Sequence, residues 1–165
     1  MGAELSERRM IHAKVIVADR SLASAQDTVD LITQEGFIAS AAARDATAEA
    51  QVKSLIGLAV ERYGRLDILQ NNVGASIALG DAVAEEMTEE AFDRSFAVNL
   101  KTAWLASKHA VPVLRQFGGG SIVNIASLAV LQAYPLVGYK TMKAAVVALT
   151  QNMAAAHAKD SIRVN

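Results

Sequence analysis

Residues 121–149 read SIVNIASLAVLQAYPLVGYKTMKAAVVAL, and they predict a buried β-strand followed by a long α-helix. The run SIVNIA (121–126) has the length and apolar character of a strand in a parallel sheet. From about Tyr139 to Ala158, apolar residues then recur at helical spacing. Ser127 follows the strand directly, at the carboxyl end where ligands bind in open α/β sheets. The same stretch therefore indicates both a fold and a candidate site.

Three polar residues of this stretch have a spacing that suits carbonyl chemistry. Twelve positions separate Ser127 from Tyr139, and Lys143 follows four positions after the tyrosine. Residues four apart lie on one face of a helix, so the Lys143 ammonium can favour the phenolate of Tyr139. A phenol in water keeps its proton up to about pH 10, so proton transfer at neutral pH requires such a neighbour. An ordinary helix with one aromatic residue and one exposed lysine is the alternative, and spacing alone leaves both open.

The rest of the chain alternates short apolar runs with longer helix-periodic segments, which is typical of a parallel sheet covered by helices. Strands are expected at 14–18, 37–42, 66–70 and 121–126, with a strand beginning at 162–165. Helices are expected from the cap Ser21 to Glu35, from Thr47 to Gly64, from the cap Thr88 through Asn99 towards Leu114, and from about Tyr139 to Ala158. The pattern predicts a single α/β domain that spans residues 1–165.

Composition excludes several classes of protein. Apolar residues make up 52% and charged residues 20% of the 165 residues, which excludes a disordered chain. A net charge of −1 gives no bulk attraction to nucleic acid or to an anionic membrane. Cysteine is absent, and His12, His109 and His157 lack metal-ligand spacing, so we assign no metal site. The acidic cluster at 81–90 is interpreted as a solvated helix start. With no apolar run of roughly 18 residues and no secretory signal, we expect a cytoplasmic protein without nucleic-acid or membrane partners.

Seven features, in this order along nearly the whole chain, resemble the short-chain dehydrogenase/reductase family. They are VADRS (17–21), Asp45 in RDAT, GRLDILQNNVG (64–74), Asn99 in FAVNLKTAW, SIVNIAS (121–127), YKTMK (139–143) and SIRVN (161–165). The resemblance implies a Rossmann-like, doubly wound parallel sheet with helices on both faces. It also implies an NAD(P)-dependent oxidoreductase that moves a hydride between nicotinamide and a secondary alcohol or ketone.

The resemblance gives four residues a catalytic role. Tyr139 would be the general acid/base, and Lys143 would favour its phenolate and bind the nicotinamide ribose. Ser127 would hold the substrate oxygen. Asn99 would hold a water in a proton relay; a surface asparagine is the alternative, although its apolar neighbours indicate a buried stretch.

The resemblance also assigns residues to a cofactor. Asp19 closes the first strand, where an acidic residue binds the ribose 2′-hydroxyl of adenosine, and its charge favours NAD over NADP. Arg20 weakens that preference, and a strand-ending aspartate before a helix cap is the alternative for Asp19.

Four further positions, Asp45, Asn72, Val73 and Gly74, are implied in cofactor binding. Asp45 would contact adenine, and Asn72 to Gly74 would line the ribose side of the cofactor. Gly74 would allow a close approach of the backbone. Val73 stands where the family usually has alanine, which predicts a tighter fit.

Two departures from the family pattern lead to a competing hypothesis. No glycine-rich turn precedes Lys14, and the family continues beyond SIRVN, so we expect a fragment without the first strand and the C-terminal part. The strands at 14–18 and 66–70 would then have unpaired edges unless they close on each other, and NAD binding would be weak or absent. The alternative function is an inactive fragment or an interaction module. Family interfaces also predict a homo-oligomer through the helices at 88–115 and 139–158.

Overall fold

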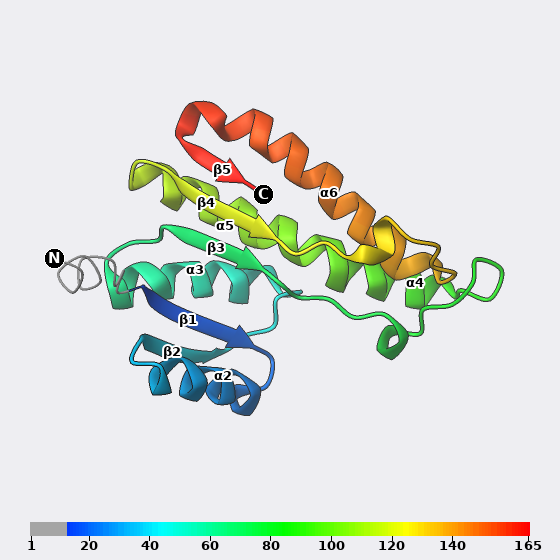
Figure 1. Ribbon diagram of the computed structural model, residues 1–165, viewed down its shortest axis with the longest axis horizontal. Coiled ribbons are helices and arrows are strands. Elements are labelled where there is room, and N and C mark those ends of the chain that lie inside the picture. Colours follow the sequence, from blue (N-terminus) through cyan, green and yellow to red (C-terminus); the bar gives the residue numbers. More distant parts are fainter. Residues whose placement is uncertain (1–12) are drawn as a thin grey trace, which may run out of the picture. The chain divides into compact units, whose positions relative to one another are not determined.

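The computed structural model describes residues 13–165, so His12 lies outside the described residues. The chain divides into two compact units, Met1–Arg44 and Asp45–Asn165. Within the described residues the strands form a two-stranded sheet, β1–β2, and a three-stranded sheet, β3–β4–β5 (Figure 1). Every strand pair is parallel. The α/β class and the parallel strands predicted from the sequence are therefore confirmed.

The first unit is a short βαβ arrangement. It contains β1 (Lys14–Asp19), α2 (Leu22–Gln34) and β2 (Ile38–Ala43). Ser21 caps α2 as predicted, since its side chain accepts a hydrogen bond from the backbone nitrogen of Ser24 at 3.3 Å. Ala25 and Val29 are the buried residues of α2. The second strand begins and ends one residue later than expected.

The second unit contains the main core. Its strands are β3 (Ile68–Asn71), β4 (Gly120–Asn124) and β5 (Ile162–Val164), and its long helices are α3 (Glu49–Tyr63), α5 (Thr102–Gln116) and α6 (Val137–His157). The helix α5 contacts β3 and β4, and α6 contacts β4 and β5 (Figure 1). The buried cluster consists of Ile56, Ala110, Val111, Leu114, Ile122, Met153, Ile162 and Val164. Each of these three helices thus covers the sheet with an apolar stripe.

The helix predicted from Thr88 towards Leu114 forms with one irregularity. It consists of α4 (Glu89–Phe96), a π-helical turn at Ala97–Lys101 and then α5. Thr88 caps α4, because its hydroxyl accepts from the backbone nitrogen of Ala91 at 3.2 Å. Asn99 lies inside the π-helical turn, and such turns are frequent at functional sites.

The carboxyl ends of β3 and β4 lead into the loops that carry most candidate site residues. The loop after β3 contains a short 3₁₀ turn at Ile77–Leu79, and the loop after β4 contains another at Leu128–Val130. Strands β1 and β3 belong to different sheets in the described chain, so the two edges expected to be unpaired do not pair with each other.

Candidate active site

Tyr139 and Lys143 lie on one face of α6, as their spacing predicted. The Nζ atom of Lys143 is 5.8 Å from the centroid of the Tyr139 ring. The tyrosine is half-buried, whereas Lys143 is only 3% exposed. The alternative of an exposed lysine is therefore wrong, and a cation stands beside the aromatic ring.

Lys143 is held at the end of β4. Its Nζ donates a hydrogen bond to the carbonyl oxygen of Ile125 at 2.7 Å. Burial lowers the pKa of Lys143, because the ammonium loses part of its hydration. An ammonium has three hydrogens, so the group can bind a further acceptor while it stays fixed to this carbonyl.

Gly74 lies where the side chains of Asn99 and Lys143 converge. A Cβ atom at Gly74 would be 3.0 Å from Oδ1 of Asn99 and 3.1 Å from Nζ of Lys143. No larger residue fits there without displacing one of the two groups. The predicted close approach at Gly74 is thus present, and in this structure its neighbours are these two side chains.

Asn99 is 1% exposed and uses both ends of its amide. Its Oδ1 accepts from the backbone nitrogen of Ala75 at 2.9 Å, and its Nδ2 donates to the carbonyl oxygen of Ala75 at 2.8 Å. Nδ2 also donates to Oγ of Ser95 at 3.2 Å. The side chain therefore fastens the loop after β3 to the π-helical turn, which is a role beside the water-holding role that the resemblance implies.

Ser127 follows β4 as predicted and begins the 3₁₀ turn of that loop. Its hydroxyl accepts from the backbone nitrogen of Ala129 at 3.2 Å, and the residue is half-buried. It stands two positions after Ile125, whose carbonyl holds Lys143. One short segment therefore carries the serine and positions the ammonium.

Sequence reasoning missed a polar layer beneath the site. Nδ2 of Asn71 donates to Oδ1 of Asn124 at 2.8 Å and to Oγ of Ser107 at 3.3 Å. Nδ2 of Asn124 donates in turn to the hydroxyl of Thr150 at 2.9 Å. These bonds join β3, β4, α5 and α6. The only signal in the sequence was an asparagine at the end of each of two apolar strands.

Sequence reasoning also missed Asp81, which belongs to the acidic cluster interpreted as a solvated helix start. That interpretation is wrong for this residue. Its carboxylate accepts from the backbone nitrogens of Gly138 at 2.7 Å and Tyr139 at 2.9 Å, and from the hydroxyl of Ser76 at 2.8 Å. No local pattern could reveal these bonds, because 57 and 58 positions separate Asp81 from its partners on α6.

The first unit carries the predicted residues Asp19 and Arg20 at the carboxyl end of β1. Oδ1 of Asp19 accepts from the backbone nitrogen of Ser21 at 2.7 Å, and both Asp19 and Arg20 are exposed. The aspartate thus supports the start of α2 and still presents its carboxylate to solvent.

The remaining candidates of the second unit lie in turns. Oδ1 of Asp45 accepts from the backbone nitrogen and the hydroxyl of Thr47, at 2.8 Å and 2.7 Å. Asn72 and Val73 are exposed beyond the end of β3. Asp45 therefore organises the turn before α3, and the pair after β3 is accessible.

The described part of the chain holds no group of three or more histidine, cysteine, aspartate or glutamate residues that could bind a metal. His109 lies 3.0 Å from Glu49, and His157 lies 3.4 Å from Asp160. Both histidines are thus partly buried partners of carboxylates on the helices. Among residues 13–165, no helix has both the length and the apolar character to cross a membrane.

The whole chain is similar to known dehydrogenases. A family model described as short chain dehydrogenase matches residues 1–165. An uncharacterized oxidoreductase of Thermotoga maritima is 40% identical over 158 residues, which are 93% of this chain and 59% of that protein. A 7alpha-hydroxysteroid dehydrogenase of Bacteroides fragilis is 32% identical over 167 residues, which are 100% of this chain and 64% of that protein. The chain spans only these shares of the relatives' lengths.

Solved structures show the same likeness. A 7alpha-hydroxysteroid dehydrogenase complexed with NADH and 7-oxo glycochenodeoxycholic acid superposes with a TM-score of 0.85 at 32% identity, over 93% of this chain and 59% of that one. A short chain dehydrogenase from Mycobacterium smegmatis gives a TM-score of 0.86 at 33% identity, over 93% and 64%. The Rossmann-like fold predicted from the sequence is confirmed.

Proposed function

Because the chain belongs to the short-chain dehydrogenase/reductase family, we propose that it takes part in NAD(P)-dependent hydride transfer between a nicotinamide and a secondary alcohol or ketone. The observation that carries this proposal is the buried ammonium of Lys143 beside Tyr139, with Asn99 and Gly74 packed against it. Such a cation next to a half-buried phenol serves proton transfer better than it serves stability, because burying an ammonium costs free energy.

The residues of the site would divide the chemistry as follows. A reduced nicotinamide, when bound, supplies the hydride that reaches the carbonyl carbon. Tyr139 would donate its hydroxyl proton to the carbonyl oxygen, so that an alcohol forms, and would take the proton back in oxidation. Lys143 would stabilise the resulting phenolate, and Ser127 would orient the carbonyl oxygen by a hydrogen bond.

The described residues fit parts of a dinucleotide. In the first unit, the exposed carboxylate of Asp19 suits the ribose hydroxyls of an adenosine, and it favours NAD over NADP. In the second unit, Lys143 has hydrogens left for a ribose oxygen, and Gly74 leaves the loop after β3 without a side chain. The preference for NAD and the cytoplasmic location stay predictions of the sequence.

The replacement Tyr139→Phe tests the proposal. We expect a loss of turnover of about 10²–10⁴-fold, the usual contribution of a general acid/base. Turnover would be followed by NADH absorbance with a panel of ketones and secondary alcohols, including hydroxysteroids because relatives bear that name. Tyr63→Phe, which changes the last residue of α3, is the matched control. Equal turnover in both variants would contradict the role of Tyr139.

A second test addresses the competing hypothesis of a fragment without cofactor. We expect titration calorimetry to detect NAD binding and Asp19→Asn to weaken it. If the unmodified chain gives no heat with NAD or NADP at millimolar concentration, the hypothesis of an inactive fragment gains and the enzymatic proposal loses.

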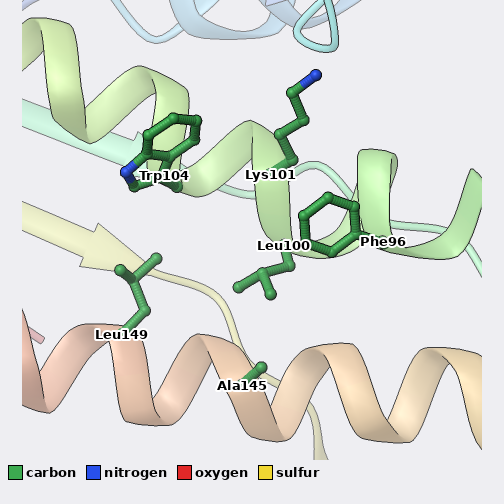
Figure 2. A pocket seen from close by; sticks show the side chains of 6 residues that line it. All are labelled: Phe96, Leu100, Lys101, Trp104, Ala145 and Leu149. Atoms are coloured by element: carbon green, nitrogen blue, oxygen red, sulfur yellow. The ribbon is translucent and has the colours of Figure 1, made fainter. Parts of the chain in front are cut away.

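We also propose that the chain forms a homo-oligomer through the helices at 88–115 and 139–158. An apolar cavity of about 240 Å³ opens between the turn–helix segment 96–104 and α6 (Figure 2). It is lined by Phe96, Leu100, Lys101, Trp104, Ala145 and Leu149. Phe96 and Trp104 are 44% and 45% exposed, which is a large apolar surface for a monomer to leave in water. Trp104→Glu should lower the mass measured by light scattering, and a monomeric unmodified chain would contradict the proposal.

A further inference from the structure

The N-terminus of α6, the helix that carries Tyr139, is capped by a distant loop. Its own cap residue is Leu136, whose side chain cannot accept a hydrogen bond from the helix. The first three backbone nitrogens of α6 donate instead to the segment 81–82. Val137 donates to the carbonyl oxygen of Ala82 at 2.9 Å, and Gly138 and Tyr139 donate to the carboxylate of Asp81. A negative charge at a helix N-terminus is also favoured by the helix dipole.

We propose that Asp81 is a positioning residue for Tyr139, because its carboxylate fixes the backbone from which the phenol projects. The inference rests on the proposed role of Tyr139 as the acid/base. Oδ1 of Asp81 binds the nitrogen of Gly138, and Oδ2 binds the nitrogen of Tyr139 itself. A shift of this carboxylate would therefore move the first turn of α6 and the tyrosine with it.

The absence of a side chain at Gly138 supports the inference independently. A Cβ atom there would lie 2.9 Å from Oδ1 of Asp81, 2.7 Å from Cε of Met87 and 3.0 Å from Oγ of Ser95. Only glycine lets the loop with Asp81 approach α6 this closely. Ser95 is in turn a partner of Asn99, so the contact extends to the other side of the candidate site.

The hydroxyl groups of Ser76 and Tyr134 complete the contacts of Asp81, and their direction follows from its charge. A carboxylate has no proton to give, so Ser76 donates to Oδ2 of Asp81. Having spent its only hydrogen, Ser76 must accept from the hydroxyl of Tyr134, which lies 2.9 Å away. The Tyr134 ring is 6.1 Å from the Tyr139 ring at an angle of 54°. Asp81 thus holds the backbone of Tyr139 directly and braces its ring through two hydroxyls.

The experiment compares variants of the full chain by amide hydrogen exchange and by steady-state kinetics. Asp81→Asn keeps the size of the side chain but turns a hydrogen donor towards α6. We expect the amides of Gly138 and Tyr139 to exchange about tenfold faster or more. We also expect kcat to fall while KM for the carbonyl substrate changes little. Gly138→Ala should give the same pattern, and Ser76→Ala should affect these two amides less.

Thr88→Ala is the matched control, because it removes a cap of the same kind from α4, which does not begin at the tyrosine. It should leave the two amides of α6 and kcat unchanged. Unchanged exchange at Gly138 and Tyr139 in Asp81→Asn would overturn the inference, as would an equal loss of kcat in Thr88→Ala at matched stability. If Tyr139→Phe keeps full turnover, the proposed function fails, whereas exchange at the two amides still decides whether Asp81 holds this turn.

Discussion

Lys143 combines a charge with nearly complete burial, which makes it the residue whose protonation matters most to this site. Its ammonium has a fixed partner in the carbonyl of Ile125 and stands against Gly74. Burial lowers the pKa of Lys143, so the folded chain binds this proton less tightly than the unfolded chain does. Folding therefore strains the charge that the proposed chemistry uses.

This strain predicts how stability depends on pH. Between the lowered pKa of folded Lys143 and the unfolded value near 10.5, the unfolded chain holds the proton that the folded chain releases. The contribution of Lys143 to stability therefore rises with pH across that window and is at its lowest below it. In Lys143→Met this rise should disappear, which urea unfolding at several pH values between 7 and 10 would measure.

Lys140→Met is the control for this prediction, because Lys140 lies on the same helix and also donates to a backbone carbonyl, that of Gln132, but in an exposed position. If the difference in unfolding free energy between the unmodified chain and Lys143→Met is the same at every pH, the buried ammonium is not the cause.

At the scale of the element, the π-helical turn at Ala97–Lys101 connects helix geometry to the site. It lies between α4 and α5 and contains Asn99, whose amide holds both backbone groups of Ala75. Since Gly74 precedes Ala75 directly, this pair of bonds also sets the position of the glycine against which Lys143 packs.

The replacement Asn99→Ala should lower the free energy of unfolding by about 2–4 kcal/mol, because it leaves buried backbone groups of Ala75 without partners. Asn152→Ala is the matched control, an exposed asparagine within α6, and should change stability by about 0.5 kcal/mol or less. Urea unfolding followed by circular dichroism measures both. Equal stability of the two variants would mean that water replaces the lost bonds.

The elements also show which features a sequence can reveal. Ser21, Thr88 and Gly64 were predicted as helix ends and serve as such, because capping depends on a few neighbouring residues. The π-helical turn was not predicted, since its apolar spacing continues that of the helices around it. Asp81 could not be found either, because its partners on α6 are distant in the sequence.

At the scale of the whole molecule, the two units differ in how much apolar surface they bury. In the first unit, the buried hydrophobic residues among those described are Ala25, Val29 and Ala42, while Leu31 and Ile38 are 64% and 48% exposed. The second unit has a cluster of eight buried residues from three helices and two strands. Hydrophobic burial is the main favourable contribution to folding, so the second unit should be the more stable one.

Native-state hydrogen exchange should show this order directly, with the amides of α2 exchanging faster than those of α5, because low local burial permits opening at low free energy. Leu114→Ala, a fully buried position of α5, should destabilise the second unit by about 2–5 kcal/mol and narrow the difference between the two helices. Leu31→Ala, an exposed position of α2, is the control and should change stability little. Protection of α2 equal to that of α5 in the unmodified chain would show that the first unit draws stability from contacts beyond its own small core.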